Sequence, residues 1–233
     1  MIKNKNILII GGSSGIGLAL ADLLSSSNNI YVASRSSDNL SGLNAHHITF
    51  DATSESLDTS LLPEKLDGFV YCPGSINLRP FKGLSVEAFE KDFQINVTGA
   101  INSLKNVLGN LSASGNASIV FFSTVAVQTG MPFHSSVAAS KGAIEGLTRS
   151  LAAEFAPKIR VNAIAPSLVN TPLASKFLNN ETKLEKANER HPLGRIGSAK
   201  EIAQAAAFLL GEESSWMTGR VLQLDGGIGN LKT

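Results

Sequence analysis

The chain has 233 residues, of which 43% are hydrophobic and 17% are charged, and its formal net charge at pH 7 is +1. This length supports one substantial hydrophobic core and is short for two. The small net charge and the absence of a Lys/Arg block give no reason to expect nucleic acid or acidic lipid as a partner. The single cysteine excludes an internal disulfide framework and offers no metal-ligand cluster, so we predict no metal.

The first residues, MIKNKNILIIGG, contain an apolar stretch too short for a signal-peptide core or a membrane span. No linker, internal repeat or low-complexity tract divides the chain. We therefore expect a single cytoplasmic domain over residues 1–233 that does not bind a membrane.

Short apolar runs alternate with helical patterns along the chain. The first run, NILII at 6–10, is wholly apolar apart from its first residue and is typical of a strand buried on both faces of a parallel sheet. The later runs expected to form strands are IYVAS (30–34), HITF (47–50), GFVYC (68–72), ASIVFFS (117–123), RVNAIA (160–165) and RVLQLD (220–225).

Helices are expected between these strands. One follows GGSSGIG, and three more are predicted over 85–111, 135–156 and 198–210, with Ser85 and Ser198 as N-caps. The turn-rich connection between the second and third strands predicts a loop in place of a helix. Seven strands alternating with helices predict an α/β fold: a Rossmann-like, doubly wound, seven-stranded parallel sheet with helices on both faces.

The glycine-rich segment GGSSGIG lies between the first strand and a helix. Glycine permits a tight turn and a close approach of the backbone to a pyrophosphate, and the helix N-terminus supplies free N–H groups. We predict that a dinucleotide binds here, with contacts from Gly11, Ser13, Ser14, Gly15, Ile16 and Gly17.

The end of the second strand, VASRSSD, bears on the choice of cofactor. An acidic residue at this strand tip would favour NAD, but the tip carries Ser34 and Arg35. Because a guanidinium group suits a 2′-phosphate, we predict NADP(H) in preference to NAD(H). Asp51 and Ala52 follow the third strand and are expected near the adenine, although Asp51 is also suited to capping a turn.

The chain resembles the short-chain dehydrogenase/reductase family over essentially its whole length. The motifs that carry the resemblance are GGSSGIG (11–17), INVTG (95–99), SIVFFST (118–124), ASKGAIEGLTRSLAAE (139–154), IRVNAIAPSLVNTPL (159–173), HPLGRIGSAKEIA (191–203) and TGRVLQLDGG (218–227). The later motifs are most similar to the β-ketoacyl-carrier-protein reductase branch. The resemblance implies a nicotinamide cofactor, a small-molecule substrate and a homodimer or homotetramer. It also implies cofactor contacts from Gly74, Asn96, Lys141, Pro166, Val169 and Thr171.

The chemistry of this family uses an Asn, a Ser, a Tyr and a Lys. The resemblance places the Asn at Asn96, the Lys at Lys141 and the Ser at Thr124, with Ser123 beside it. In the family the Tyr gives a proton to the carbonyl oxygen as hydride arrives at carbon, while the Lys lowers the phenol pKa and holds the nicotinamide ribose. The Tyr position is Val137, which has no proton to give.

Other departures from the family pattern lie near the same site. The end of the fourth strand reads YCPG at 71–74, Ile10 replaces the threonine before the glycine loop, and Ser167 replaces the glycine after Pro166. We infer that the cofactor scaffold is kept and that the catalytic mouth is altered.

Two residue types could replace the missing acid. His134 precedes Lys141 by seven residues, close to two helical turns, and the enoyl-carrier-protein reductase branch places its Tyr at this spacing. A histidine can donate a proton near neutral pH, but the slightly favoured interpretation of His134 is a surface polar residue. Tyr31 belongs to the adenosine side, and the direction of the Tyr71 side chain stays open.

Two further residues receive structural interpretations. Cys72 could line the cleft, but we favour core packing for this lone cysteine, and we place the substrate loop roughly at 172–190. His191, directly after this loop, could touch substrate, but we favour a surface position.

Three functions remain open. The first is an NADP(H)-dependent oxidoreductase with an atypical active site, acting on an activated acceptor such as a conjugated alkene, an iminium or a quinone. Losing a general acid slows proton transfer by about 10²–10⁴-fold but does not forbid hydride transfer. The alternative is a catalytically degenerate NADP(H)-binding or regulatory subunit of the same fold. A third, weaker hypothesis is lyase or isomerase chemistry on this scaffold.

For self-association we predict pairing through 85–111, 135–156 and the C-terminal segment. The second of these helices offers the small residues Ala138, Ala139, Gly142 and Gly146.

Overall fold

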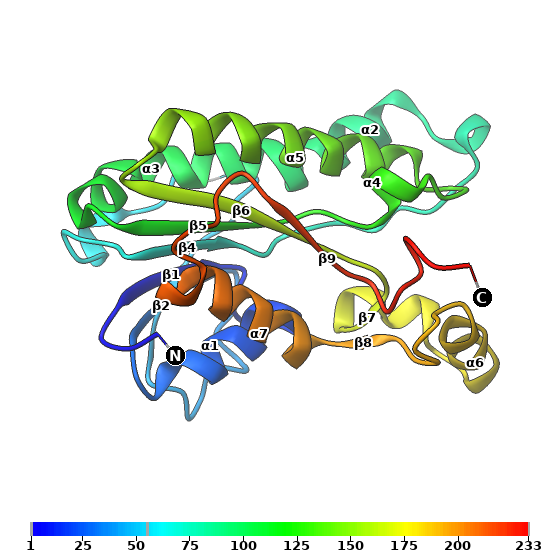
Figure 1. Ribbon diagram of the computed structural model, residues 1–233, viewed down its shortest axis with the longest axis horizontal. Coiled ribbons are helices and arrows are strands. Elements are labelled where there is room, and N and C mark those ends of the chain that lie inside the picture. The colour runs from blue at the N-terminus through cyan, green and yellow to red at the C-terminus, as the bar shows by residue number, and fades with distance from the viewer. Residues whose placement is uncertain (1, 55, 233) are drawn as a thin grey trace.

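A computed structural model describes residues 2–54 and 56–232. It contains a seven-stranded, all-parallel sheet in the order β3-β2-β1-β4-β5-β6-β9 (Figure 1). Its strands are β1 (Asn6–Ile10), β2 (Asn29–Ser34), β3 (Ala45–Thr49), β4 (Gly68–Tyr71), β5 (Ala117–Phe122), β6 (Ile159–Pro166) and β9 (Val221–Leu224). Every predicted run forms one of these strands, and the Rossmann-like fold class is confirmed. The strand order reverses between β1 and β4, which is where doubly wound sheets bind their ligands.

Helices cover both faces of the sheet, as Figure 1 shows. One face carries α1 (Gly15–Ser25) and α7 (Ala199–Leu210), which pack against each other. The opposite face carries α2 (Val86–Phe93), α3 (Gly99–Ser114) and α5 (Ser135–Phe155). The short α4 (Ala126–Thr129) follows β5, and α6 (Glu181–Glu189) lies beyond the sheet, beside the two-stranded sheet of β7 (Val169–Asn170) and β8 (Gly197–Ser198).

The core divides into two buried clusters, one on each face of the sheet. Strand residues alternate between them: Ile7 and Ile9 pack with α1 and α7, whereas Leu8 and Phe69 pack toward α3 and α5. Because strands in a parallel sheet are covered on both sides, these side chains are all buried and the runs are continuously apolar.

The helix predicted over 85–111 is interrupted. Ser85 caps α2 as predicted, accepting a hydrogen bond from the Ala88 amide. A π-helical turn (Gln94–Thr98) then separates α2 from α3 and contains Asn96. Such turns reorient the residues around them, so the irregularity falls on a predicted site residue.

Two connections differ in their order. Residues 36–44 contain no helix, as predicted for the turn-rich connection. The expected substrate loop instead folds into the 3₁₀ segment η4 (Pro172–Phe177) and the helix α6. Asn180 caps α6 by accepting a hydrogen bond from the Lys183 amide at 2.9 Å.

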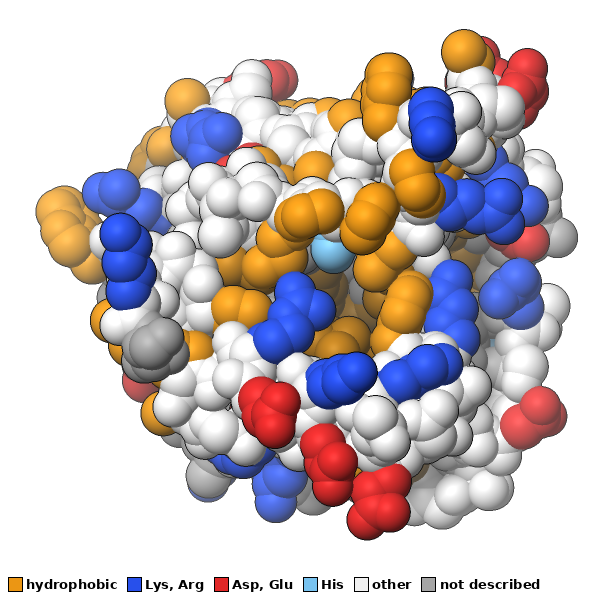
Figure 2. All heavy atoms as spheres, turned by 90° about the vertical axis from the view of Figure 1, so that its right-hand side faces the viewer, with side chains coloured by type: hydrophobic (Ala, Val, Ile, Leu, Met, Phe, Trp, Pro, Cys, Tyr) orange, Lys and Arg blue, Asp and Glu red, His pale blue; other side chains and the backbone are white. Residues whose placement is uncertain are grey.

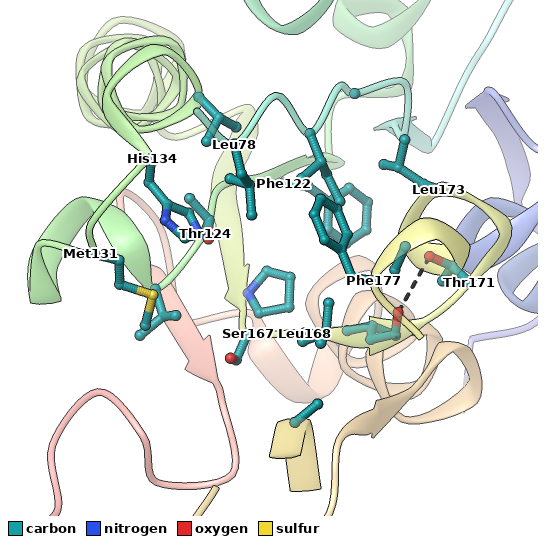
Figure 3. Close-up of a pocket in the computed structure, with 18 of the residues that line it drawn as sticks. Leu78, Phe122, Thr124, Met131, His134, Ser167, Leu168, Thr171, Leu173 and Phe177 are labelled. Carbon is teal, nitrogen blue, oxygen red and sulfur yellow. Dashed lines mark hydrogen bonds between the residues drawn. The ribbon is translucent and has the colours of Figure 1, made fainter. Parts of the chain in front are cut away.

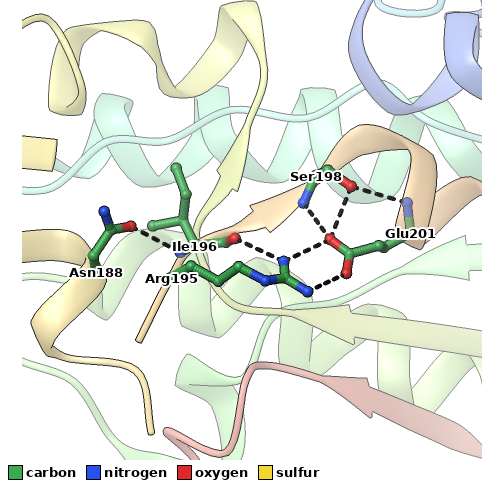
Figure 4. A network of polar contacts seen from close by, with 5 residues as sticks. All are labelled: Asn188, Arg195, Ile196, Ser198 and Glu201. Carbon is green, nitrogen blue, oxygen red and sulfur yellow. Dashed lines mark hydrogen bonds and ion pairs between the residues drawn. The ribbon is translucent and has the colours of Figure 1, made fainter. Parts of the chain in front are cut away.

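A polar network joins the end of α6 to the start of α7 (Figure 4). The predicted N-cap Ser198 is confirmed, because it forms a capping box with Glu201. Arg195 donates to both Glu201 carboxylate oxygens at 2.6 and 3.0 Å, and this hydrogen bonding is the main reason that the Glu201 pKa falls to about 2. The Ile196 amide donates to Asn188 Oδ1 at 3.0 Å, which ties the network to the last turn of α6. Among the described helices, none is both long enough and apolar enough to cross a membrane.

Candidate active site

Two cavities lie at the carboxyl ends of the strands. The first, which we call the glycine-loop cavity, has a volume of about 570 Å³ and is bordered by the β1–α1 loop. It is lined by a large part of the predicted cofactor residues: Gly11, Ser13, Ser14, Gly15, Ile16, Gly17, Ser34, Arg35, Asp51, Ala52, Gly74 and Thr171. Lys141, Pro166 and Val169 line the second cavity instead, and Asn96 borders neither directly.

The glycines of this loop are required by its geometry. Gly11 and Gly15 adopt φ values of +75° and +55°, which L side chains rarely adopt. A Cβ on Gly17 would lie 2.5 Å from the Gly11 carbonyl oxygen, so the loop closes on itself without room for a side chain. The Ser14 side chain does not cap α1, so it takes none of the amide donors of the first turn. These donors and the helix dipole suit an anion, and the residues present therefore fit a dinucleotide pyrophosphate.

The adenosine end of this cavity carries Arg35, which is exposed. Asp51 accepts hydrogen bonds from the Thr53 amide and hydroxyl at 2.9 and 2.7 Å, so it caps a turn while it lines the cavity. These two bonds, and to a smaller degree the charge of Arg35, lower the pKa of Asp51. The lining of this cavity thus includes two cations, Arg35 and Lys91, and one carboxylate, with no acidic residue at the tip of β2.

The second cavity, which we call the apolar cavity, has a volume of about 460 Å³ (Figure 3). Its lining includes Thr124, His134, Val137 and Lys141, which are four of the five residues predicted to bear on catalysis; Asn96, the fifth, does not line it. Val137 is buried, with 6% of its surface exposed. Most of the other lining side chains are apolar, among them Ile76, Leu78, Phe122, Met131, Leu168, Leu173, Phe177 and Ile228.

Lys141 lies where the two cavities approach each other. Gly74 lines both cavities, and Lys141 lies close to it. A Cβ on Gly74 would lie 3.6 Å from Lys141 Nζ and 3.3 Å from Asn96 Oδ1. Burial disfavours the ammonium form and lowers the Lys141 pKa to about 8, an effect that nearby Cys72 opposes. A cation with this pKa changes charge near neutral pH, which is uncommon outside functional sites.

Asn96 is held by a buried polar network. Its Nδ2 donates to Ser75 Oγ at 2.8 Å and to the Asp92 carbonyl at 2.7 Å. The Asp92 carboxylate accepts from Ser75 at 2.6 Å and from Ser136, the residue before Val137. Asn96 Oδ1 is buried and has no hydrogen-bond partner in the described residues. Because an unpaired buried acceptor is costly, this oxygen is suited to a donor from a ligand or a water.

The two tyrosines are not replacement acids. Tyr71 is buried, packs against Gly99 and donates its hydroxyl to the Ile95 carbonyl at 2.6 Å, and burial raises its pKa. Tyr31 stacks on His46, with ring centroids 5.0 Å apart, between strands β2 and β3 on the adenosine side. The structure thus settles the direction of Tyr71, which the sequence left open.

His134 is half-buried, so the structure is compatible with both interpretations, the surface polar residue and the candidate acid. The residue immediately precedes α5, and its side chain lines the apolar cavity together with Lys141. Its Nδ1 lies 2.7 Å from the Pro132 carbonyl oxygen, an acceptor, so Nδ1 carries the hydrogen of that bond. Nε2 is therefore the nitrogen that could exchange a proton with a bound molecule.

His191 was expected at the surface, and this is wrong. It is 5% exposed, because α6 folds back and the chain after it returns beneath the apolar cavity. His191 Nδ1 donates to the Ala187 carbonyl at 2.7 Å, and its Nε2 lies 2.9 Å from Ser167 Oγ. With Nδ1 protonated, neutral His191 accepts the Ser167 hydroxyl. Ser167, which replaces the glycine of the family pattern, therefore has a buried hydrogen-bond partner in His191.

Cys72 does more than the predicted packing. It packs against one core cluster but also lines both cavities. Burial raises its pKa to about 12, so the thiol is protonated at neutral pH. Ser123, beside Thr124, donates its hydroxyl hydrogen to buried Glu145 at 2.7 Å. This hydrogen is therefore not available to a substrate.

Sequence reasoning missed two groups of residues. One is the Asp92 network, whose members run from Ser75 to Ser136 in the chain. The other is a set of cations around the apolar cavity, Lys176, Lys183, Lys186 and Arg190. The spacing of the last three, at intervals of three and four, is a helical signal that the sequence offered.

Comparison with known proteins identifies the family. The sequence profile described as Enoyl-(Acyl carrier protein) reductase matches residues 11–229. A 2,5-dichloro-2,5-cyclohexadiene-1,4-diol dehydrogenase of Sphingobium indicum is 34% identical over 97% of both chains. The chain belongs to the short-chain dehydrogenase/reductase family.

Solved structures of this family agree with the assignment. A short-chain type dehydrogenase/reductase from Mycobacterium ulcerans superposes with a TM-score of 0.89 at 26% identity, over 98% of this chain and 90% of that one. ElxO, whose structure has NADP bound, gives a TM-score of 0.87 at 27% identity over 97% of this chain and 98% of its own. The short-chain dehydrogenase/reductase fold therefore accounts for nearly the whole chain.

Proposed function

We propose that this short-chain dehydrogenase/reductase is an NADP(H)-dependent oxidoreductase with an atypical active site that lacks the tyrosine acid. Residues 1–233 act as one nucleotide-binding domain, and the substrate is a small molecule with an activated acceptor, such as a conjugated alkene, an iminium or a quinone. The nicotinamide, when bound, supplies or accepts the hydride. The likeness of the later motifs to the β-ketoacyl-carrier-protein reductase branch stays a prediction, as do a cytoplasmic location and self-association.

One observation carries this proposal: a buried lysine and an unpaired buried amide oxygen lie together at the junction of the two cavities. Lys141 Nζ and Asn96 Oδ1 both approach the Gly74 backbone. Burying a lysine costs free energy, and Asn96 Oδ1 beside it has no hydrogen-bond donor among the described residues. A purely structural role for Lys141 does not account for this arrangement. A ribose hydroxyl or an ordered water would satisfy that acceptor and give Lys141 a partner.

Arg35 supports NADP(H) over NAD(H). It lines the glycine-loop cavity at the tip of β2, and a charge-assisted bond to a 2′-phosphate contributes roughly 1.5–3 kcal/mol. We expect Arg35→Ala to weaken NADPH binding about tenfold or more and to leave NADH binding unchanged, as measured by cofactor fluorescence. Arg220→Ala, at an exposed position directly before β9, is the matched control. Equal losses for both cofactors would contradict the assignment of Arg35 to the 2′-phosphate.

Proton delivery falls to His134 in this proposal. Val137 is buried and aliphatic, whereas His134 presents Nε2 to the same cavity. A general acid contributes about 10²–10⁴-fold to a rate. We expect His134→Gln to lower kcat by about that factor for acceptors that need a proton, and to change the rate little for acceptors such as quinones.

A second candidate function is a catalytically degenerate NADP(H)-binding subunit. The burial of Val137 favours it, because a well-packed valine at the tyrosine position is what a site without selection for proton transfer would hold. NADPH oxidation against ketones, quinones, enones and imines, run beside Val137→Tyr, separates the two. Turnover of an activated acceptor by the unmodified chain supports the oxidoreductase. NADPH binding without turnover, combined with ketone reduction gained by Val137→Tyr, supports the binding subunit.

A further inference from the structure

The apolar cavity has a charge bias that the whole chain does not have. Its lining includes Lys141, Lys176, Lys183, Lys186 and Arg190, and none of the described lining residues is Asp or Glu. The formal net charge of the whole chain is only +1. Cations are therefore concentrated at this cavity and are balanced by acidic residues elsewhere.

The bias comes from the way α6 is oriented. Lys183, Lys186 and Arg190 follow one another at intervals of three and four residues, so they share the face of α6 that lines the cavity. The acidic residues Glu181, Glu185 and Glu189 lie on other faces and do not line it. A helix turned the other way would present carboxylates, so the orientation of α6 selects the sign of charge at the cavity.

Among the described residues, Lys186 and Arg190 have no partner for their charge, whereas Lys176 and Lys183 form hydrogen bonds. Lys176 Nζ donates to the Ile76 carbonyl at 2.7 Å and lies 4.9 Å from the centre of the Phe177 ring, and Lys183 Nζ donates to Asn179 at 2.8 Å. In the part of the chain that the structure describes, no carboxylate lies within ion-pair distance of Lys186 or Arg190. Both side chains are thus available to an external anion.

The interior of the cavity is apolar, and its mouth is basic. Figure 2 shows hydrophobic side chains surrounding a hollow with Lys and Arg side chains along its rim. Apolar side chains from four separate segments line the interior, including Leu78, Met131, Leu168 and Phe177. A ligand that fits both parts needs an apolar body and a negative group at one end.

We infer that the substrate is an amphipathic anion: a chain or ring of hydrocarbon that lies in the apolar cavity, with a carboxylate or phosphate held under α6 by Lys186 and Arg190. This inference rests on the proposed function, because it names the substrate class of the same site. It places the reacting group toward Lys141 and Thr124, away from the charged end.

The test measures binding of four probes to the NADPH-saturated chain by calorimetry: decanoate, decyl phosphate, decanol and decyltrimethylammonium. We expect both anions to bind at least tenfold more tightly than decanol, and the ammonium probe not to bind. Raising NaCl from about 50 to 500 mM should weaken the anions and leave decanol unchanged, since partly exposed charges are screened. A stronger preference for decanoate or for decyl phosphate tells which anionic group the natural substrate carries.

The double variant Lys186→Gln/Arg190→Gln should remove the advantage of the anions over decanol. Lys105→Gln/Lys158→Gln makes the same change of charge at exposed positions on α3 and after α5 and should preserve the advantage. Equal binding of decanoate and decanol, absence of anion binding, or an anion preference that survives in the Lys186/Arg190 variant would overturn the inference. Cofactor fluorescence reports NADPH binding separately, so failure of the proposed function is distinguished from failure of this inference. The salt series on the unmodified chain decides the matter even if the variant does not fold.

Discussion

The two cavities are built from different parts of the chain. The glycine-loop cavity is bordered by the backbone of a tight loop, in which Gly17 has no room for a Cβ, and by the first turn of a helix. The apolar cavity is lined by side chains from segments as far apart as Ile76 and Ile228. Backbone groups suit the pyrophosphate that dinucleotides share, whereas side chains can be exchanged without altering the fold. This difference explains how the cofactor pattern is retained while Val137, Ser167 and the basic face of α6 give the second cavity its own character.

The largest effect is expected at Lys141, which lies at the junction of the cavities. Its pKa falls from 10.5 to about 8 on burial, so the folded chain binds fewer protons than the unfolded chain between these values. Stability consequently rises with pH across that window, and the buried ammonium costs about 3 kcal/mol below it. We expect Lys141→Met to stabilise the cofactor-free chain by up to that amount at pH 7, with the gain shrinking as pH rises from about 8 toward 10.5.

Urea unfolding at several pH values measures this effect. Lys105→Met, at an exposed position of α3, is the control and should leave the pH profile unaltered. The same Lys141 variant should lose NADPH-dependent activity by about 10²-fold or more, since it removes a positioned group. Equal stability of the variant and the unmodified chain at pH 7 would mean that the Lys141 ammonium is well solvated. It would contradict a Lys141 pKa lowered by burial.

Gly17 tests whether the backbone-built cavity tolerates a side chain. A methyl group there would lie 2.5 Å from the Gly11 carbonyl oxygen, so the loop must shift. Overpacking of this kind costs about 1–3 kcal/mol, and we expect Gly17→Ala to raise the Kd for NADPH at least tenfold. Gly109→Ala is the control, because its Cβ would meet nothing within 4 Å and alanine favours a helix by up to about 1 kcal/mol. Unfolding and cofactor titration of both variants check this, and unchanged NADPH binding by Gly17→Ala would refute it.

The side-chain-built cavity should respond through paired residues. His191→Leu leaves the Ser167 hydroxyl and the Ala187 carbonyl without their partner and is expected to destabilise the chain by about 1–3 kcal/mol. Ser167→Ala alone should cost about 0.5–1.5 kcal/mol. A double-mutant cycle should give a smaller cost for Ser167→Ala when His191 is already replaced. Strict additivity would show that the 2.9 Å contact carries no energy.

The smallest effect concerns the network that joins α6 to α7. Glu201 is paired with Arg195, but both side chains are substantially exposed, so solvent screening keeps the contribution of the pair to stability small. Because its pKa is depressed from 4.5 to about 2, this stability is present above pH 4.5 and is lost as pH falls toward 2. Thermal unfolding of Glu201→Gln at pH 7 and pH 2.5 should show the difference narrowing at the lower pH. Glu154→Gln, at an exposed position of α5, serves for comparison.

The fold was predictable because its signals are local. The run NILII followed by GGSSGIG predicts a buried strand, a tight turn and a helix within twenty residues, and Ser85 and Ser198 mark helix starts by their own chemistry. The π-helical turn around Asn96 was not predictable in this way, because its surroundings are set by contacts between α2, α3 and α5.

The candidate site was predictable to the extent that residues stand in motifs. Thr124, Val137 and Lys141 do meet in one cavity. The burial of His191 depends on α6 returning over the end of the sheet, and the cavity-facing position of His134 depends on the loop before α5. Such long-range packing leaves no trace in a window of neighbouring residues. The helix α6 was missed for a different reason. Its local signals, the N-cap Asn180 and the helical spacing of its charged residues, are present in the sequence but were not used.

The weak anchoring of α6 has a practical consequence. The helix has nine residues and buries the side chain of Ala187 alone among its described residues, so it is too short to be stable without its surroundings. Its last turn is held by the bonds of Ala187 and Asn188, while its first turns rest on the cavity. Segments of this kind open with a low free energy, and their amide hydrogens exchange with solvent deuterium quickly. A molecule that fills the apolar cavity and pairs with the basic face of α6 would slow this exchange. The deuterium uptake of residues 181–189 thus offers a way to screen single compounds for binding to the apolar cavity before any reaction has been assayed.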